Sequence, residues 1–202
     1  MTSLQLSSAL GGTLLLCALL HACVRMWRRA KQWRKEKEVS RFEVCHLKSA
    51  TRKNREQLIA LLAEDERDES ADGSTHFWPK RDVILADFDA QRPSFWLARE
   101  RGCESACAFA WGEPTFEDST RSSVVFAVIA LFVSPRKRRQ GVGMQLVAAL
   151  RDAAREARCA AVRGDVQENS TSARAFWCAA GFRAIASGGG YQTWHFSLAS
   201  QA

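Results

Sequence analysis

The chain has 202 residues, enough for one domain and an extension, and its 47% hydrophobic content excludes an intrinsically disordered protein. Its formal net charge of +7 is concentrated between residues 25 and 38, where seven Lys or Arg stand against two Glu, so that only +2 remains elsewhere. Because the basic charge is local and the sequence shows no motif that reads DNA or RNA, we expect no nucleic-acid partner.

An apolar segment without charged side chains occupies residues 4–24. As a helix, these 21 residues would be about 31 Å long, close to the ~30 Å hydrocarbon thickness of a bilayer. The cations follow this segment, whereas a cleavable secretory signal has them in front. Lys and Arg beside a membrane span stay in the cytosol. We therefore predict a membrane-anchor helix at 1–24, a basic linker at 25–40, and a domain at 41–202 that faces the cytosol.

Three other roles for the N-terminal segment stay open. Residues 20–23 faintly resemble a bacterial lipoprotein box, although no positive charge precedes them. The Arg-rich stretch after an apolar start is also compatible with an organelle-targeting peptide. The third role is an amphipathic anchor that lies in the membrane interface, helped by acylation of Cys17 or Cys23.

Hydrophobic periodicity predicts strands and helices from residue 41 onward. Residues 49–51 can cap the first helix, which is expected to end at the acidic residues 64–66. The polar stretches 67–76 and 113–121 are expected to be loops, and residues 100–104 a hairpin turn. The expected strands are 42–48, 94–99, 106–111, 123–133, 160–166, a strand that resumes at 181–182, and 191–198, and the expected helices are 52–66, 81–88, 141–157 and 170–180.

This order of elements, βααβββαβαββ, indicates an α/β (α+β) fold. A mixed sheet of six to seven strands would carry about four helices on its faces, in addition to the apolar N-terminal helix. The nearly continuous apolar run 123–133 predicts a central strand that is covered on both faces. Trp96 and Trp111 lie in strand patterns and are expected in the core. The second helix is expected to bury Val83, Ile84 and Phe88.

A cationic, glycine-containing loop follows the central strand, with the sequence Arg138, Arg139, Gln140, Gly141, Val142, Gly143. The first turn of a helix leaves backbone N–H groups unpaired, and the helix dipole adds partial positive charge there. Glycines let a large anion approach these amides, and Arg138 and Arg139 can add charge-assisted bonds to phosphate oxygens. The pattern is therefore suited to a pyrophosphate.

Two sequence blocks resemble a known enzyme family. VSPRKRRQGVGMQLVAAL resembles the acetyl-CoA signature of the GCN5-related N-acetyltransferase (GNAT) family, with Arg138, Gly141 and Gly143 at its three defining positions. The stretch 169–182, NSTSARAFWCAAGF, resembles the family's second block, and residues 42–198 follow the family's order of elements. The resemblance implies a GNAT fold and direct transfer of an acetyl group from acetyl-CoA to a primary amine.

The resemblance also implies which residues contact acetyl-CoA. The pantetheine arm would pair with the backbone of Leu131, Phe132 and Val133, and the pyrophosphate would bind at residues 138–143. The second block would contribute the four residues Asn169, Ser170, Phe176 and Trp177. The other substrate would be an amine acceptor, and Trp78 is a candidate to line its site.

The catalytic groups of the family are less complete in this sequence. Trp177 occupies the position of the Tyr that protonates the leaving thiolate in many relatives, and an indole N–H is no useful acid. Ile129 and Ala130 hold the positions where the fourth strand of relatives often carries an acid. The best remaining base is Glu168.

Glu168 is assigned from a faint resemblance to the diamine acetyltransferase branch. When the two sequences are aligned without a gap backward from Phe176 and Trp177, Glu168 falls on that branch's catalytic glutamate and Ser170 on its usual Asn. Shifting this alignment by one residue places Asn169, rather than Ser170, at the position of that Asn. A solvated residue without a catalytic role is the alternative for Glu168.

Two functions stay open, an active N-acetyltransferase and a module of the same fold that binds acyl-CoA without turnover. The intact cofactor loop favours the enzyme, and the missing acid and base favour the binding module. Seven scattered cysteines indicate reduced thiols, and no Cys or His spacing indicates a metal site. The oligomeric state is left open, with a homodimer among the alternatives.

Overall fold

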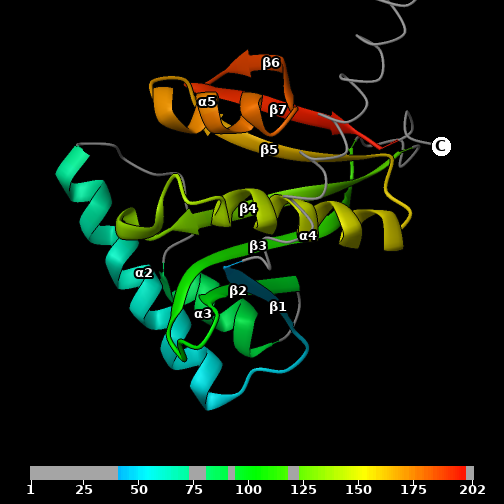
Figure 1. The fold of residues 1–202 in the computed structure, drawn as a ribbon. Helices are drawn as coiled ribbons and strands as arrows, with labels where there is room; N and C mark the ends of the chain where they lie inside the picture. Colours follow the sequence, from blue (N-terminus) through cyan, green and yellow to red (C-terminus); the bar gives the residue numbers. More distant parts are fainter. Residues whose placement is uncertain (1–40, 73–80, 91–93, 118–122, 199–202) are drawn as a thin grey trace, which may run out of the picture. The chain divides into compact units, whose positions relative to one another are not determined.

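The computed structural model describes residues 41–72, 81–90, 94–117 and 123–198. The predicted anchor and linker lie outside these described residues. The elements are β1 (Phe42–Leu47), α2 (Arg52–Asp72), α3 (Arg81–Asp89), β2 (Ser94–Glu100), β3 (Ala106–Phe116), β4 (Val124–Val133), the 3₁₀ turn η1 (Pro135–Lys137), α4 (Val142–Glu156), β5 (Ala161–Gln167), α5 (Thr171–Ala179), β6 (Arg183–Gly188) and β7 (Tyr191–Ser197) (Figure 1). The predicted order of strands and helices is confirmed.

The strands form one mixed sheet in the order β1-β2-β3-β4-β5-β7-β6. Only the β4–β5 pair is parallel among these strands, and the five other pairs are antiparallel. A parallel neighbour requires a crossover, and α4 makes the crossover from β4 to β5. The apolar strand β4 is central, as its sequence predicts.

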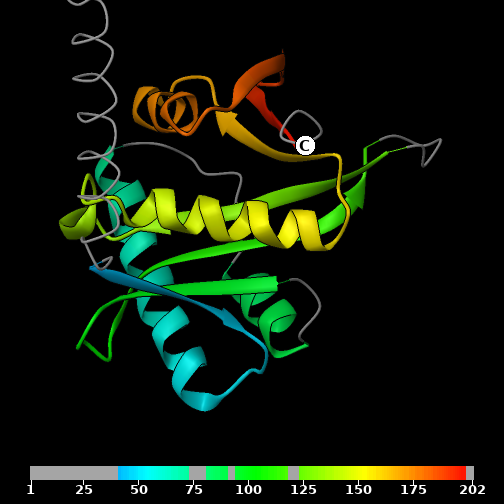
Figure 2. The ribbon, with the colours of Figure 1, turned by 45° about the vertical axis from the view of Figure 1, so that its right-hand side comes forward.

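Helices cover both faces of the sheet, and each face has its own apolar core. On one face, α4 and α5 pack through residues such as Leu146, Leu150 and Trp177. On the other face, Leu58 of α2 and Ile84 of α3 pack against the sheet. We call these the α4 face and the α2 face; Figure 2 shows α4 lying along the first of them.

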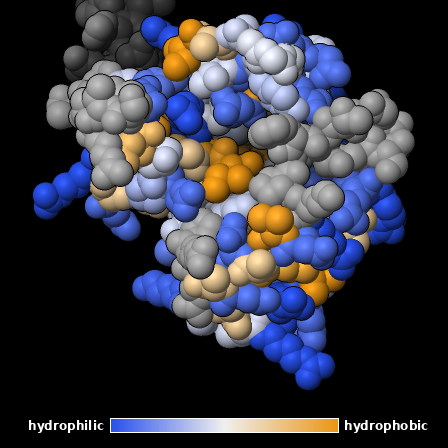
Figure 3. All heavy atoms as spheres, turned by 180° about the vertical axis from the view of Figure 1, so that it is seen from behind, coloured by the Kyte–Doolittle hydropathy of each residue, from blue (hydrophilic) through white to orange (hydrophobic). Residues whose placement is uncertain are grey.

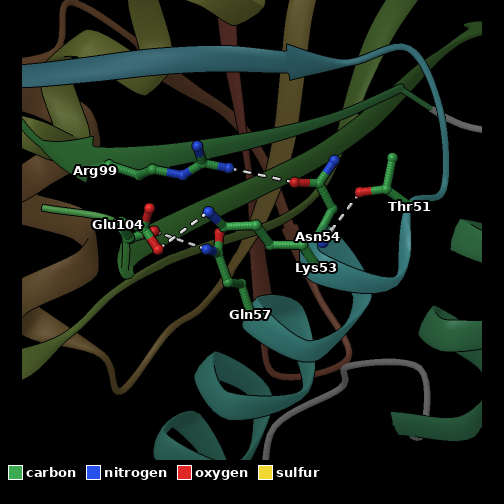
Figure 4. A network of polar contacts seen from close by, with 6 residues as sticks. All are labelled: Thr51, Lys53, Asn54, Gln57, Arg99 and Glu104. Carbon is green, nitrogen blue, oxygen red and sulfur yellow. Dashed lines mark hydrogen bonds and ion pairs between the residues drawn. The ribbon is translucent and has the colours of Figure 1, made fainter.

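The start of α2 is fixed to the β2–β3 hairpin by polar contacts (Figure 4). The Thr51 hydroxyl accepts the Asn54 N–H at 3.2 Å, which confirms the predicted N-cap. The Asn54 side chain accepts a bond of 3.2 Å from Arg99 on β2. Gln57 donates to the Glu104 carbonyl at 2.7 Å, and Lys53 pairs with the Glu104 carboxylate at 3.2 Å. These contacts set the position of the helix on the sheet.

The prediction that the first helix ends at residues 64–66 is wrong, because α2 continues to Asp72. Two acidic residues in its second half have partners across the molecule rather than solvent alone. Glu64 accepts a hydrogen bond of 2.8 Å from the Ser134 hydroxyl, and Asp68 pairs with Arg138. Because these carboxylates are paired in the folded chain, the helix extends through a segment whose charge indicated a loop.

Two further predictions require correction. The polar stretch after residue 112 does not begin a loop, since β3 continues to Phe116 in register with β4. On α3, Val83 is 48% exposed and Leu85 is buried in its place beside Ile84 and Phe88. Trp96 and Trp111 are buried, as predicted.

Within the described ranges, no helix combines the length and apolarity that crossing a bilayer requires. The same residues contain no group of His, Cys, Asp or Glu side chains that could hold a metal ion.

Candidate functional site

Strands β4 and β5 separate halfway along their length. Their pairing begins at Val125↔Ala161 and ends at Val128↔Gly164. Beyond this point β4 stays paired with β3, and β5 stays paired with β7, to the ends of both strands. The sheet therefore opens between residues 129–133 and 165–167, and the two strands diverge there (Figure 2). The open edge of β4 offers backbone N–H and C=O groups to a ligand.

A β-bulge in β4 lies at the start of this opening. Trp111 pairs with Ala130 and Gly112 pairs with Val128, so Ile129 is the extra residue. As a result Ile129 and Ala130 both lie on the α2 face. The bulge therefore presents two apolar side chains, and no carboxylate, where the sequence resemblance locates the acid of other family members.

The loop after β4 is built around its own backbone and around Ser134, which is buried. The Ser134 N–H donates to the Cys107 carbonyl at 2.9 Å, and the Lys137 N–H donates to the Ser134 carbonyl at 2.8 Å. Lys137 also forms a half-buried ion pair with Glu100 of β2. The loop is therefore held to β3, β2 and α2 before α4 begins.

The N-terminus of α4 is open to a ligand. Its N-cap, Gly141, has φ +87°, and a side chain added there would meet no atom within 4 Å. The first bond of the helix runs from the Gln145 N–H to the Gly141 carbonyl at 3.2 Å. The N–H groups of Val142, Gly143 and Met144 precede that bond and point out of the helix end, where the dipole favours an anion.

The two arginines of the loop differ in their contacts. Arg138 donates from Nε to the Val133 carbonyl at 3.0 Å, pairs with Asp68, and lies 5.9 Å from the Phe132 ring centroid. It thus ties the loop to the end of β4 and to α2. Arg139 has φ +60° and is exposed. Gln140 donates to the Arg136 carbonyl at 2.9 Å, which closes the turn.

Two aromatic side chains of α5 fill the α4 face of the opening. A Cβ on Gly143 would lie 3.0 Å from Phe176 Cε2, so glycine allows α5 to approach α4 closely. Trp177 is buried over Gly164, where an added Cβ would lie 3.6 Å from the indole. The structure therefore brings Gly143, Phe176 and Trp177 together with the end of the β4–β5 pairing.

Glu168, Asn169 and Ser170 lie on the turn between β5 and α5. Glu168 is exposed, its N–H donates to the Gly190 carbonyl at 3.0 Å, and its own carbonyl accepts from Arg174 at 3.1 Å. It follows Gly164 by four residues, or about 13 Å of extended strand. Ser170 is the N-cap of α5, with no capping bond from its side chain. Trp78, the predicted acceptor contact, lies outside the described residues.

Sequence reasoning missed a carboxylate at the opening. Asp165 directly follows the last β4–β5 pair, and its Oδ1 accepts a hydrogen bond of 2.7 Å from the Thr193 hydroxyl on β7. The available signal was the alternation in β5, where a charged residue stands between Gly164 and Val166. Its significance depends on where β4 and β5 part, which local sequence does not reveal.

Comparison with known proteins identifies similar folds. A model of the acetyltransferase (GNAT) family matches residues 55–182, which confirms the predicted resemblance, while no curated protein matches the sequence. A GNAT-family acetyltransferase from Staphylococcus aureus is 15% identical, with 78% of this chain and 99% of that chain covered and a TM-score of 0.61. The ribosomal-protein-S18-alanine N-acetyltransferase of Escherichia coli is 15% identical, with 78% and 94% covered and a TM-score of 0.56. A Salmonella typhimurium protein solved with its cofactor acetyl-CoA is 13% identical, with 81% and 97% covered and a TM-score of 0.58.

Proposed function

Because the chain belongs to the acetyltransferase (GNAT) family, we propose that it is an acetyl-CoA-dependent N-acetyltransferase that transfers the acetyl group directly to a primary amine. One observation carries this proposal. The unpaired edge of β4 is followed, after the loop of residues 134–141, by the open N-terminus of α4. A strand edge suits the amide groups of pantetheine, and a helix N-terminus suits a pyrophosphate.

The residues of the loop fit the phosphates of acetyl-CoA. Space at Gly141 lets an anion reach the amides of Val142 and Gly143 without meeting a side chain. The exposed Arg139 supplies a cation that can bind phosphate oxygens, together with the Gln140 backbone. Arg138 already has protein partners, so its part in this proposal is to hold the loop in position as well as to add charge.

The pantetheine arm is assigned to the open edge of Leu131, Phe132 and Val133. The side chains of these residues alternate between the two faces, so that only their backbone groups point along the edge. Phe176 and Trp177 provide an apolar wall beside the arm, and residues 169–170 lie at the far side of the opening. We assign all of these residues to acetyl-CoA binding.

The chemistry then rests on orientation and on proton transfer from the amine. Trp177 provides no acid for the leaving thiolate, and the β4 bulge provides no base. Holding an amine in the reactive orientation beside a bound thioester can supply much of the rate enhancement. The acceptor is a small amine or a peptide amine, and nearness to the diamine acetyltransferase branch stays a prediction.

We further propose that residues 4–24 tether the domain to a membrane, with the catalytic domain on the cytosolic side. The support is the order of the sequence, in which a charge-free apolar segment is followed at once by seven Lys or Arg within residues 25–38. Tryptophans 27 and 33 suit the headgroup region. The membrane would thus concentrate the enzyme near acceptors at its cytosolic surface.

The proposal is tested by calorimetric titration of acetyl-CoA into the full chain in detergent micelles, followed by thiol release with a panel of amines. We expect binding and turnover with at least one primary amine. Binding without turnover on any amine would instead support an acyl-CoA-binding module, a function that Trp177 and the apolar bulge favour. Absence of acetyl-CoA binding would overturn the assigned site.

A further inference from the structure

The two faces of the sheet differ in how open they are at the point where β4 and β5 separate. On the α4 face, Trp177 covers Gly164 and Phe176 closes on Gly143. On the α2 face, the described helices α2 and α3 pack against β2, β3 and β4, and the buried apolar core that they form there includes no described residue of β5 or β7. Among the described residues, the α2 face is therefore the side that is left open to an acceptor amine at this point.

Asp165 lies on that open face. The residues on either side of it in β5, Gly164 and Val166, both face the α4 core, where Gly164 lies under Trp177. Because side chains alternate along a strand, Asp165 points to the α2 face, and its side chain is exposed there. Figure 3 shows the molecule from the side opposite to that of Figure 1, with apolar residues between hydrophilic ones near its middle.

The register puts Asp165 level with the β4 bulge. Val128 pairs with Gly164, so the next residues along the two parallel strands are Ile129 and Asp165. These are the first residues on either side of the opening. A thioester at the inner end of a pantetheine arm on residues 131–133 would lie at this level, because the arm enters from the loop at the other end of β4.

A neighbouring hydroxyl holds the Asp165 carboxylate in place. Thr193 is the cross-strand partner of Asp165 on β7 and donates to Oδ1 at 2.7 Å. The second carboxylate oxygen can then accept a proton from an incoming amine. Arg163 and His195, which pair two residues before Asp165 along β5, lie on the same face, so the carboxylate lies in a polar surface rather than in the core.

We propose that Asp165 is the general base of this acetyltransferase; the inference rests on the proposed function. The carboxylate takes one proton from the acceptor ammonium, and the neutral amine nitrogen then forms a bond to the thioester carbonyl carbon. As the C–S bond breaks, its electron pair leaves on the coenzyme A sulfur, which takes the second proton from nitrogen. The proton on Asp165 passes to solvent. The products are the N-acetyl amine, coenzyme A thiol and one released proton.

This geometry ranks Asp165 ahead of Glu168, the base suggested by the sequence resemblance. Asp165 is one residue beyond the last β4–β5 pair, whereas Glu168 is four beyond it. At about 3.3 Å per residue, Glu168 lies roughly 10 Å farther out, level with the arm rather than with its reacting end. A base has to lie within hydrogen-bond reach of the proton it removes, directly or through one water.

The test compares two acceptors in the full chain. The first is the best alkylamine of the panel, and the second is its fluorinated analogue, whose nitrogen is already neutral at about pH 7.5. Asp165→Asn keeps an oxygen for Thr193 but cannot take a proton. We expect kcat/KM to fall by about 10²- to 10⁴-fold for the alkylamine and by less than ~10-fold for the neutral analogue. Acetyl-CoA affinity should stay unchanged, and Asp165→Glu should restore part of the rate.

Asp152→Asn is the matched control, since Asp152 is an exposed carboxylate on α4 that pairs with Arg155 and lies outside the site. The assignment would be overturned if Asp165→Asn lowered kcat/KM equally for both acceptors, or for neither. It would also be overturned if Glu168→Gln, and not Asp165→Asn, lowered kcat/KM more for the alkylamine than for the neutral analogue. If the wild-type chain binds acetyl-CoA but acetylates no amine, the proposed function fails first and the role of Asp165 fails with it. If the wild type turns over and Asp165→Asn matches it, only the inference about Asp165 fails.

Discussion

Gly141 and Gly143 are two residues apart, but glycine is required at each for a different reason. Gly141 has φ +87° in open space, so its constraint is the backbone conformation alone. Gly143 is limited by packing, because a Cβ there would lie 3.0 Å from Phe176 Cε2. In the sequence, both glycines belong to the same motif. Only the structure shows that Gly141 is required for its backbone conformation and Gly143 for the space beside Phe176.

Substitution of Gly141 by Ala should lower the free energy of unfolding by about 1 kcal/mol, because an L side chain is strained at positive φ. Gly141→Asn should cost less, since Asn tolerates this conformation better than other residues do. Urea denaturation of the two variants and the wild type measures the difference. An Ala variant as stable as the wild type would show that the loop relaxes to another backbone conformation.

The cysteines should differ in their reaction with iodoacetamide in the native protein. Cys103 and Cys178 are exposed, whereas Cys107 and Cys159 are buried. Burial raises the pKa of both buried thiols, which lowers the fraction of reactive thiolate at neutral pH. Mass spectrometry after brief labelling should find modification at 103 and 178 and little at 107 and 159. Rapid labelling of Cys107 would mean that the loop that begins at Ser134 opens away from β3.

At the scale of elements, the sequence predicted strands and most helices because each depends on local periodicity. Strand β4 and helix α4 show this, since their apolar patterns alone locate them. The end of α2 could not be predicted in this way. In the sequence alone, the charges of Glu64 and Asp68 indicate the end of a helix. Their partners in the fold, Ser134 and Arg138, are 70 residues away, so local sequence does not reveal them.

Arg151 links α4 to the C-terminal part of the sheet. Its guanidinium carbon lies 3.7 Å from the centroid of the Phe196 ring and 5.3 Å from that of Phe182, and it donates to the Ala180 carbonyl at the end of α5. Charge on an aromatic face is stabilising, more so when water is partly excluded. This contact holds α5, and with it Trp177, against the rest of the α4 face.

Replacing Arg151 by Met keeps an apolar stem but removes the charge and the hydrogen bond. We expect the free energy of unfolding to fall by about 1–3 kcal/mol. The free energy of unfolding of Arg151→Lys should lie between those of the wild type and of Arg151→Met, because Lys keeps the charge but lacks the planar guanidinium that lies over the ring. Denaturant unfolding of the three proteins checks the order. Full stability in the Met variant would show that apolar packing alone holds α5.

At the scale of the whole molecule, the cofactor loop and the proposed base show what local sequence can and cannot reveal. The loop from residue 138 to 143 is contiguous, so its glycines and arginines are visible in a single stretch. The surroundings of Asp165 depend on the registers of β4 with β5 and of β5 with β7. These registers bring it close to Val128, 37 positions earlier in the chain, and to Thr193, 28 positions later. Only the assembled sheet brings Val128, Asp165 and Thr193 to one place.

The orientation of the chain in its proposed membrane depends on the charge difference across residues 4–24. Residues 1–24 contain no Asp, Glu, Lys or Arg, while residues 25–38 carry a net +5, and an excess of Lys and Arg stays on the cytosolic side. In sealed vesicles with their cytosolic side outward, an added protease should digest the domain from residue 41 onward. A small epitope tag at the N-terminus should survive until detergent opens the vesicles. Full protection of the domain would reverse the orientation, and recovery of the chain in the soluble fraction after carbonate washing would rule out the span itself.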